Sequence, residues 1–410
     1  MAVEQDHIST VKQAIPASRV DAEQRSADAL LLDADSATDP VVSIVLPTLN
    51  EAAGIGRCME QIHRAVEAMG IPTEVVLADS STDGTADIAQ EYGAIITEPV
   101  ESGYGAAYRH AFEQVRGDYI VMADADCTYD FEELPKLLSR AIAEEADLVL
   151  GSRLNGEIEP GAMPALHQYV GNPILTTFLN AFYGAGVSDA HSGYRVLTRE
   201  ALETLDLRTT GMEFASEMIM EAGARDLTIA EVPIVYHERV GEATLDSFRD
   251  GWRHVRFMLL NAPGYLFSLP GVLMTLLGMG ILAGAITDMQ FRGVGLGPHS
   301  AIAGSLLTLL GVQVLGLGAF ARVTANPIRR RGDPIADPLI ERVRLEHGAS
   351  LGMVIFAAGA GYGFAMLARW IESGFARLPL VMEDVAAMTA IVVGIQVVFL
   401  SFYLSAVAGD

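Results

Sequence analysis

The sequence predicts an α/β domain with a mainly parallel sheet, followed by an all-α membrane domain of four helices. Two observations lead to this fold class. From Val41 onward, short apolar runs alternate with stretches of helical spacing, which is typical of a parallel sheet covered by helices on both faces. After Arg256, four long segments carry no charged residue, and each exceeds the roughly 20 residues that a helix needs to cross a bilayer.

The α/β part can be followed element by element. Strands are expected at 41–47, 74–80, 93–97, 118–126 and 147–153, with later strands at 187–197 and 228–240. Helical spacing occupies 55–69, 131–146 and 211–224. Four of the early runs end in polar clusters, at 48–51, 79–85, 124–130 and 151–153. Because ligands bind at the carboxyl ends of parallel strands, these clusters predict one shared site.

The charge-free segments cover 257–287, 293–321, 347–368 and 385–409. We expect transmembrane helices at about 264–286, 299–321, 349–369 and 386–408, within a domain that spans 263–410. The alternative is a second soluble domain with buried helices.

Arginines set the expected orientation. Arg249, Arg253 and Arg256 precede the first span, and Arg322 and 329–331 follow the second. The positive-inside rule then places the α/β domain and both termini on the cytoplasmic side of the cell membrane. The segment 247–262 combines these arginines with aromatic residues, which favours an amphipathic helix lying in the membrane interface.

The chain is strongly acidic, with 52 acidic and 27 basic residues and a formal charge of −25. Lys12 and Lys136 are its only lysines. Dense carboxylates keep a surface hydrated in concentrated salt, which favours a halophilic source, with a merely acidic protein as the alternative. They also argue against a nucleic-acid partner. Residues 1–40 hold eight acids and no apolar run of a secretory signal, so a disordered acidic tail is expected. Cys58 and Cys127 make neither a zinc site nor a disulfide framework.

Asp124 and Asp126 follow the apolar run Tyr119 to Met122. Residues two apart in a strand share a face, so both carboxylates can reach one point. They repel each other unless a cation lies between them. Mg²⁺ or Mn²⁺ prefers such hard oxygen ligands and completes its shell with substrate phosphates. The alternative is a capping or turn role for the two acids.

A dinucleotide-binding domain is the obvious competitor, but its Gly-x-Gly-x-x-Gly turn is missing. The first turn reads "PTLNEAAGIG", and "SGYGAAYRHA" has Tyr108 at the third glycine position. Asp79 at a strand tip can instead accept hydrogen bonds from a nucleobase. Asp83 to Thr85 fit a turn and helix cap better than a ligand site.

The motifs "VSIVLPTLNE", "DSSTDGT", "GDYIVMADADCTYDFEELP", "LVLGSR", "DAHSGYRVL" and "EVPIVYHERVGE" resemble those of family 2 glycosyltransferases of GT-A fold. More narrowly, they resemble polyprenyl-phosphate glycosyltransferases, including the membrane-anchored archaeal dolichol-phosphate mannose and glucose synthases with four spans. The resemblance covers 41–262 by motif and 263–410 by span count, and it implies a GT-A domain at 41–246.

The resemblance also implies roles for individual residues. The nucleotide sugar would be bound by Pro47, Leu49, Glu51, Asp79, Asp124, Ala125 and Asp126. The metal ligands would be Asp124, Asp126 and Thr128. The catalytic group would be Asp124, Asp126, Arg153 and Arg239, with the arginines at the phosphates. The acceptor side would comprise Asp189, Ser192, Gly193, Tyr194, Arg195 and Glu217. His167 follows Arg153 and is expected to face the acceptor phosphate, with a structural role as its alternative.

Two positions depart from the family pattern. Thr128 stands where Gln is frequent and is the weaker metal ligand. Gly241 to Leu245 reads Gly-Glu-Ala-Thr-Leu, which lacks a phosphate-binding lysine. We expect Arg249 or Arg253 to substitute for that lysine. The alternative is that the enzyme uses a different donor or has a reduced activity.

The implied reaction transfers a hexose from GDP-mannose, UDP-glucose or UDP-N-acetylglucosamine to dolichyl or another polyprenyl phosphate. It would occur at the cytoplasmic membrane face, with inversion and with Mg²⁺ or Mn²⁺, for protein N-glycosylation or other surface glycans. Two alternatives stay open. One is transfer to a hydroxyl of a lipid-linked sugar or polysaccharide, although no Q-x-x-R-W motif is present. The other is a membrane protein that binds nucleotide sugar without catalysis.

Overall fold

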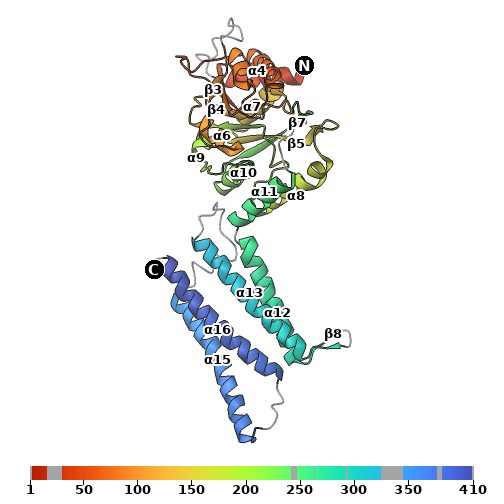
Figure 1. The fold of residues 1–410 in the computed structure, drawn as a ribbon, viewed down its shortest axis with the longest axis vertical. Coiled ribbons are helices and arrows are strands. Elements are labelled where there is room, and N and C mark those ends of the chain that lie inside the picture. Colours follow the sequence, from red (N-terminus) through yellow and green to blue (C-terminus); the bar gives the residue numbers. More distant parts are fainter. Residues whose placement is uncertain are drawn as a thin grey trace. The chain divides into compact units, whose positions relative to one another are not determined.

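A computed structural model describes residues 2–15, 30–241, 247–262, 264–291, 294–324, 345–375 and 381–408 (Figure 1). The chain divides into two compact units, Met1–Met258 and Leu259–Asp410. The first unit holds the sheet, and the second holds the long apolar helices.

The first unit contains a seven-stranded sheet in the order β3-β2-β1-β4-β6-β5-β7. Every neighbouring pair is parallel except those made by β6, which runs antiparallel between β4 and β5. The expected mainly parallel fold class is therefore confirmed. The carboxyl ends of six strands and the amino end of β6 lie at one edge. The strands are β1 (Val42–Thr48), β2 (Thr73–Asp79), β3 (Ile95–Thr97), β4 (Tyr119–Met122), β5 (Leu148–Ile158), β6 (Arg195–Thr198) and β7 (Ile229–Tyr236).

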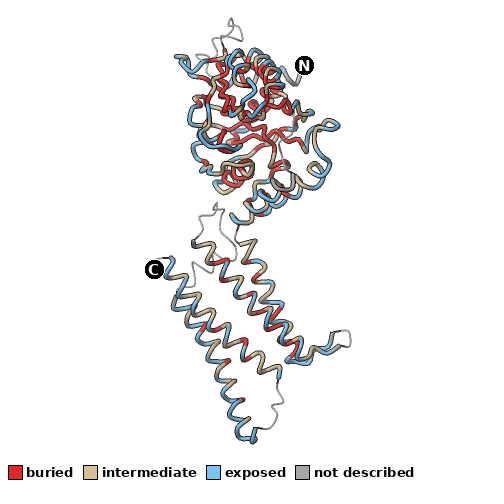
Figure 2. The backbone as a smooth tube through the Cα atoms, viewed as in Figure 1, coloured by how far each residue is buried: buried red, intermediate tan, exposed pale blue. Residues whose placement is uncertain are grey.

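The main core lies between one face of the sheet and the helices α4 (Ile55–Met69) and α7 (Leu134–Ala143) (Figure 2). Alternate residues of β1, such as Val42 and Ile44, belong to this core, because side chains of a strand point to opposite faces in turn. Gly70 ends α4 at φ 65°, a left-handed conformation that glycine adopts without a steric penalty.

The other face carries α6 (Tyr104–Phe112) and α10 (Phe214–Ala224). Here Tyr108 stacks on Phe214 with ring centroids 5.6 Å apart. The remaining short helices of this unit are α5 (Thr85–Glu91), η1 (Phe131–Glu133), η2 (His167–Gly171), α8 (Asn172–Tyr183) and α9 (Arg199–Thr204). Helices therefore cover both faces of the sheet, as the alternating pattern predicts.

The predicted disorder of 1–40 is wrong for the residues that the structure describes there. Helix α1 (Ala2–Ala14) packs on α7, and Val11 is fully buried. His7 Nδ1 lies 2.8 Å from the Ser139 hydroxyl, and the backbone N–H of Leu32 donates to Thr73 at 2.8 Å. The apolar residues of this segment are few and scattered, so its acidic composition gives no sign of a folded helix. Burial against a folded domain gives them the stability that they lack alone.

The strand expected at 187–197 is shorter in the structure, where β6 begins at Arg195. The preceding residues form a loop held by side chains: the backbone N–H of Ser188 donates to the Glu231 carboxylate at 2.9 Å, and that of Ala190 to the Thr176 hydroxyl at 3.3 Å. These bonds satisfy the backbone without a sheet partner, so the loop leaves the ladder.

Helix α11 (Ser247–Asn261) follows. Of its described side chains, His254 and Met258 are buried, whereas Trp252 and Leu260 are more than half exposed. The hydroxyl oxygen of Ser216, on α10, lies 2.8 Å from His254 Nδ1. The helix therefore has one face packed on the domain and one open face, and its interfacial role remains a prediction.

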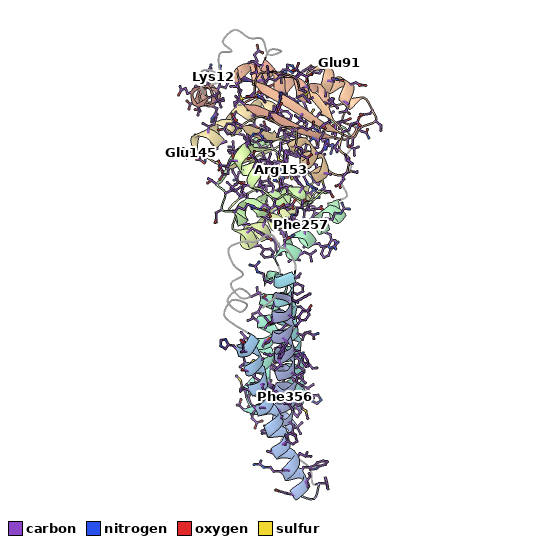
Figure 3. All side chains as sticks on the ribbon, turned by 90° about the vertical axis from the view of Figure 1, so that its left-hand side faces the viewer. Lys12, Glu91, Glu145, Arg153, Phe257 and Phe356 are labelled. Carbon is purple, nitrogen blue, oxygen red and sulfur yellow. The ribbon has the colours of Figure 1, made fainter. Side chains whose placement is uncertain are left out.

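The second unit contains four helices that are long and apolar enough to cross a membrane, at Leu266–Ile286, Pro298–Arg322, Glu346–Glu372 and Val381–Val407. Each overlaps one predicted span, with ends that differ by a few residues. Many of their large apolar side chains are exposed, among them Leu276, Val354 and Phe399, and at most 33% of any span's most apolar stretch is buried. Figure 3 shows the side chains that project from these helices. An apolar exposed surface suits a lipid environment. The elements are η3 (Gly264–Ser268), α12 (Leu269–Ile286), β8 (Gln290–Phe291), β9 (Val294–Gly295), α13 (Pro298–Thr324), α15 (Leu345–Glu372) and α16 (Val381–Ala408).

Candidate active site

The ends of β1 and β2 are joined by hydroxyl groups around one carboxylate. Thr48 and Ser81 each donate a hydrogen bond to Asp79 Oδ1 at 2.6 Å. Among the described residues, no hydrogen bond to Oδ2 is found, so that oxygen is available to the N–H groups of a base. Pro47 is half-buried in β1, and Leu49 is 54% exposed just beyond it. This end of the sheet can therefore accept a flat, polar-edged group.

The strand expected at 118–126 ends at Met122, so Asp124 and Asp126 lie in the loop after β4, and the expectation that one strand face carries both is wrong. Tyr104 donates its hydroxyl to Asp124 Oδ1 at 3.1 Å. Asp126 Oδ1 accepts from the backbone N–H of Thr128 at 3.1 Å and from its hydroxyl at 2.5 Å. Ala125 between the aspartates is buried. Thr128 thus fixes the Asp126 carboxylate, whatever its relation to a metal.

Cys127 adopts φ 65°, and its sulfur lies 3.5 Å from Cys58 Sγ and 3.4 Å from the Gly54 carbonyl oxygen. Both cysteines are free and buried. The side chain therefore packs against the α4 end of the core.

Arg239 joins the two sides of the donor end. Its Nη2 forms an ion pair with Glu51 Oε1, and its Nη1 lies 3.6 Å from Asp126 Oδ2. Burial raises the pKa of Glu51, Arg239 lowers it, and the nearby Asp126 charge raises it again. The Arg239 Nε is buried and has no hydrogen-bond partner among the residues that the structure describes. A mobile anionic ligand can compete for this guanidinium.

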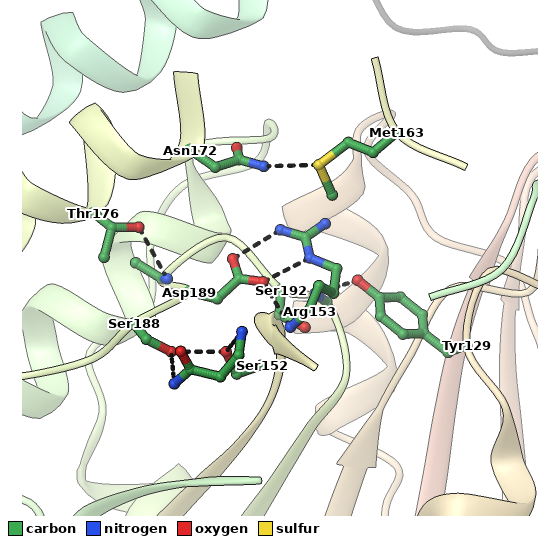
Figure 4. Close-up of polar contacts among 12 residues, drawn as sticks. Tyr129, Ser152, Arg153, Met163, Asn172, Thr176, Ser188, Asp189 and Ser192 are labelled. Carbon is green, nitrogen blue, oxygen red and sulfur yellow. Dashed lines mark hydrogen bonds and ion pairs between the residues drawn. The ribbon is translucent and has the colours of Figure 1, made fainter. Parts of the chain in front are cut away.

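Arg153 on β5 is held by Asp189 in a two-pronged ion pair (Figure 4). Its Nε and Nη2 donate to the two carboxylate oxygens at 2.8 and 2.9 Å, and its backbone N–H donates to Oδ2 at 3.0 Å. The guanidinium also lies 5.2 Å from the centroid of the Tyr236 ring, a cation–π distance. Within the described part of the chain, these contacts leave Nη1 of Arg153 without a partner.

The other expected acceptor-side residues divide into two groups. Gly193 lies next to Asp124, and its N–H donates to the Tyr129 hydroxyl at 2.7 Å. Arg195 and Glu217 are instead turned into the fold. Arg195 donates to three backbone carbonyls, and Glu217 accepts from the backbone at 208–209. The second pair can position the loop but does not open onto the site.

Three further candidates have fewer contacts. Ser192 Oγ and Tyr194 Oη are buried, and neither has a hydrogen-bond partner within the described ranges. Tyr194 packs its ring against Tyr129 and Phe131. His167 is half-buried in η2.

The charges at the paired aspartates fit a divalent cation. Burial and, to a lesser extent, the Asp126 charge raise the pKa of Asp124 to about 7, although the hydrogen bond from Tyr104 and the charges of Arg153 and Arg239 lower it. No group of three or more His, Cys, Asp and Glu with metal-site geometry exists among the described residues. Two carboxylates with an incomplete ligand shell suit Mg²⁺ or Mn²⁺, which takes its remaining ligands from phosphate and water.

The raised pKa predicts how stability depends on pH. Asp124 titrates near pH 7 in the folded protein and near its ordinary value of 3.8 when unfolded. The folded state then binds more protons between these values, so this residue makes the free energy of unfolding fall as pH rises through that window and level off above it. Thermal unfolding of the metal-free protein should show this fall. Asp124→Asn should reduce it, and an unchanged slope in that variant would contradict the assignment.

Gly193 offers a second test, because a Cβ there would lie 3.0 Å from Asp124 Oδ2 and 3.2 Å from the Tyr129 hydroxyl. We expect Gly193→Ala to displace the Asp124 carboxylate and to lower glycosyl transfer about tenfold, with a small change in melting temperature. The control is Gly171→Ala, where the nearest atom lies at 3.5 Å. Equal activities of the two variants would show that the site tolerates the shift.

Several residues of the site were not predicted from the sequence. Tyr104, Tyr129 and Tyr236 contact Asp124, Gly193 and Arg153, and Glu231 holds the Asp189 loop. The flanking motifs give a partial signal, since Tyr129 follows the aspartates and Tyr236 precedes Arg239. The residues next to Tyr104 and Glu231 in the sequence give no indication that these two side chains belong to the site. The Gly241 to Leu245 departure lies outside the described residues from Glu242 onward, as does the Arg249 side chain.

Comparison with known proteins assigns the class. The model of the family "Glycosyl transferase family 2" matches residues 43–206, and that of the "Glycosyltransferase family 2 C-terminal transmembrane region" matches 319–408. The chain belongs to glycosyltransferase family 2, is a glycosyltransferase by that membership, and is a membrane protein.

Similar proteins come from Haloferax volcanii, a halophilic archaeon. The low-salt glycan biosynthesis hexosyltransferase Agl6 is 57% identical over 379 residues, which cover 92% of each chain. The glycosyltransferase AglJ is 31% identical, over 69% of this chain and 93% of its own. A dolichyl-phosphate hexose transferase is 35% identical, over 51% of this chain and 89% of its own.

Among solved structures, glucosyl-3-phosphoglycerate synthase from Mycobacterium tuberculosis, in complex with Mn²⁺, UDP and glucosyl-3-phosphoglycerate, is 26% identical, with a TM-score of 0.45. The match covers 54% of this chain and 80% of that one.

Proposed function

We propose that this protein transfers a hexose from a nucleotide-diphosphate sugar to dolichyl or another polyprenyl phosphate, with inversion and with Mg²⁺ or Mn²⁺. The donor would be GDP-mannose, UDP-glucose or UDP-N-acetylglucosamine. The reaction would take place at the cytoplasmic face of the cell membrane and supply protein N-glycosylation or other surface glycans. The arginines that flank the first two spans support this orientation.

One observation carries the proposal. Two carboxylates, Asp124 and Asp126, share a sheet edge with two arginines, Arg153 and Arg239, in a chain with four candidate spans. Such a site can hold a cation-bound diphosphate on one side and a second phosphate on the other. The relative named a dolichyl-phosphate hexose transferase supports a lipid phosphate as the acceptor.

The proposed reaction requires little proton transfer by the protein. A phosphate monoester is ionised at neutral pH, so its oxygen can attack the anomeric carbon without a general base. The work of the side chains is to align two anionic groups and to stabilise the charge that develops on the leaving diphosphate. Bound at Asp124 and Asp126, a divalent cation would supply Lewis-acid stabilisation of that charge.

The two arginines suit different phosphates. Arg239 lies between Glu51 and Asp126 at the donor end, where a diphosphate would compete for its guanidinium. Arg153 is fixed by Asp189 and points its remaining Nη1 away from that carboxylate (Figure 4), which suits a stationary acceptor phosphate. A planar guanidinium binds phosphate with two parallel hydrogen bonds.

The proposal is tested with membranes that contain the protein, polyprenyl phosphate and each radiolabelled donor, with and without Mg²⁺ or Mn²⁺. We expect label in the lipid fraction for one donor, and its loss on chelation. If no donor labels the lipid, the acceptor assignment fails. Equal labelling in chelator would refute the metal assignment alone, and label in polysaccharide instead would favour transfer to a hydroxyl.

A further inference from the structure

The segment that leads from β5 to the acceptor-side loop has an unusual surface. Residues 160–188 contain no Asp, Glu, Lys or Arg, in a chain whose formal charge is −25. Within it, η2, α8 and the residue before η2 expose five large apolar side chains. These are Leu166 (66%), Tyr169 (72%), Val170 (44%), Ile174 (49%) and Phe178 (39%), and we call them the α8 face.

Helical spacing gathers these side chains on one surface. Leu166, Val170, Ile174 and Phe178 recur every four residues, which places them along one side of a helix. The opposite side packs on the domain, where Leu175 and Leu179 are buried. The α8 face is therefore an exposed apolar surface, on the side of the helix that does not pack on the domain.

The buried side of α8 holds the loop that carries Asp189. Thr176 accepts from the Ala190 N–H at 3.3 Å, and Asn180 makes two hydrogen bonds with the backbone of Val187, at 2.7 and 3.0 Å. Figure 4 shows Thr176 and Asn172 beside the Arg153–Asp189 pair. The helix thus has an apolar outer side and supports the phosphate-binding candidate from its inner side.

We propose that the α8 face docks on the lipid bilayer and inserts its apolar side chains into the edge of the hydrocarbon region. The same chain carries four candidate spans, so the domain works beside a membrane. An acid-rich protein keeps carboxylates on water-facing surfaces, and their absence here fits a surface that leaves water. An amphipathic helix buries its apolar side about 5–10 Å deep at the acyl boundary, and tyrosine prefers that interface.

Docking has a consequence that rests on the proposed function. If apolar side chains on the outside of α8 reach the acyl boundary, its inner side and Arg153 lie at the depth of lipid headgroups. An acceptor phosphate would then meet Arg153 without leaving the interface.

The test uses the full chain in liposomes with nitroxide probes on single introduced cysteines at Leu166, Val170, Ile174 and Phe178. Val100→Cys is the matched control, because Val100 is 94% exposed on the same domain. The unsubstituted protein serves as the blank, since Cys58 and Cys127 are buried. We expect the α8 probes to collide more with oxygen and several-fold less with a water-soluble nickel chelate than the control probe does.

Two results would overturn the proposal. Nickel accessibility equal to that of the Val100 probe would mean that the α8 face lies in water. Shielding from both oxygen and nickel would mean that protein, such as a second copy of the chain, covers it. This readout needs no activity, so it stands or fails separately from the proposed reaction.

A kinetic arm tests the consequence. Ile174→Glu places a charge on the α8 face and should raise the KM for polyprenyl phosphate in vesicles about tenfold, with the KM for nucleotide sugar unchanged. Val100→Glu, which adds the same charge elsewhere, should leave both KM values unchanged, and thermal unfolding checks the fold of each. A lipid KM within twofold of the parent for Ile174→Glu, with labelling activity intact, would refute the coupling between docking and acceptor binding.

Discussion

Asp126→Asn should lower glycosyl transfer by about a hundredfold or more, because it removes one of two charges that would hold the cation at the leaving diphosphate. The substitution is nearly isosteric. Asparagine keeps an oxygen that can accept the hydrogen bonds from Thr128 at 2.5 and 3.1 Å. It removes only the charge that lies 3.6 Å from Arg239. Labelling of lipid at saturating donor measures the loss.

The control is Asp87→Asn, an exposed aspartate in the first turn of α5, which removes the same charge away from the site. Membrane insertion and melting temperature should match the parent in both variants. Nucleotide-sugar binding that survives in Asp126→Asn without transfer separates a catalytic role from a binding role. Transfer within a few-fold of the parent would refute the assignment of Asp126.

Asp189→Asn should destabilise the domain by about 3–5 kcal/mol, the range found when one partner of a buried ion pair is removed. The Asp189 side chain is fully buried and that of Arg153 is 9% exposed. Asparagine cannot neutralise the guanidinium, which stays charged in the interior. Denaturant or thermal unfolding of the α/β domain measures the loss.

The paired exchange Arg153→Met with Asp189→Leu separates stability from function. It removes both charges and should recover most of the lost stability. Labelling of the lipid should nevertheless be absent, because the Arg153 guanidinium that would bind the acceptor phosphate is gone. Recovery of labelling in that double variant would show that Arg153 has only a structural role. Arg153→Lys keeps a charge but loses the two-pronged geometry, so an intermediate activity is expected.

The pH dependence of this pair has a defined sign. Burial alone would raise the pKa of Asp189, but the Arg153 charge and its hydrogen bonds hold it below the ordinary 3.8. The folded state therefore binds fewer protons, so the stability contributed by the pair is present above the ordinary pKa and is lost as pH falls through the folded pKa. The pair therefore loses stability as pH falls, whereas Asp124 makes the free energy of unfolding fall as pH rises. The loss at low pH should vanish in the double variant, which lacks both side chains.

The fold could be predicted to a large extent because its signals are local. Alternating apolar runs predict the strands of the parallel half, and charge-free segments of more than 20 residues predict the four long helices. The N-terminal helix was missed, since Val11 gains stability only by packing against elements that are distant in the sequence. The strand at 187–197 was predicted too long because the bonds from Glu231 and Thr176 to its backbone come from other parts of the chain.

The sequence by itself places Asp124 and Asp126 two residues apart, and this short spacing keeps the two carboxylates near each other in the loop after β4. It also determined that the chain enters a membrane, since apolarity over a span needs no tertiary partner. Only the tertiary structure decided which charges meet. Glu51 and Arg239 are 188 residues apart, and Arg153 and Asp189 are 36 apart. Such pairs form only when the order of strands in the sheet brings the right strand ends to the same edge. The pattern of residues along the chain carries no information on that order.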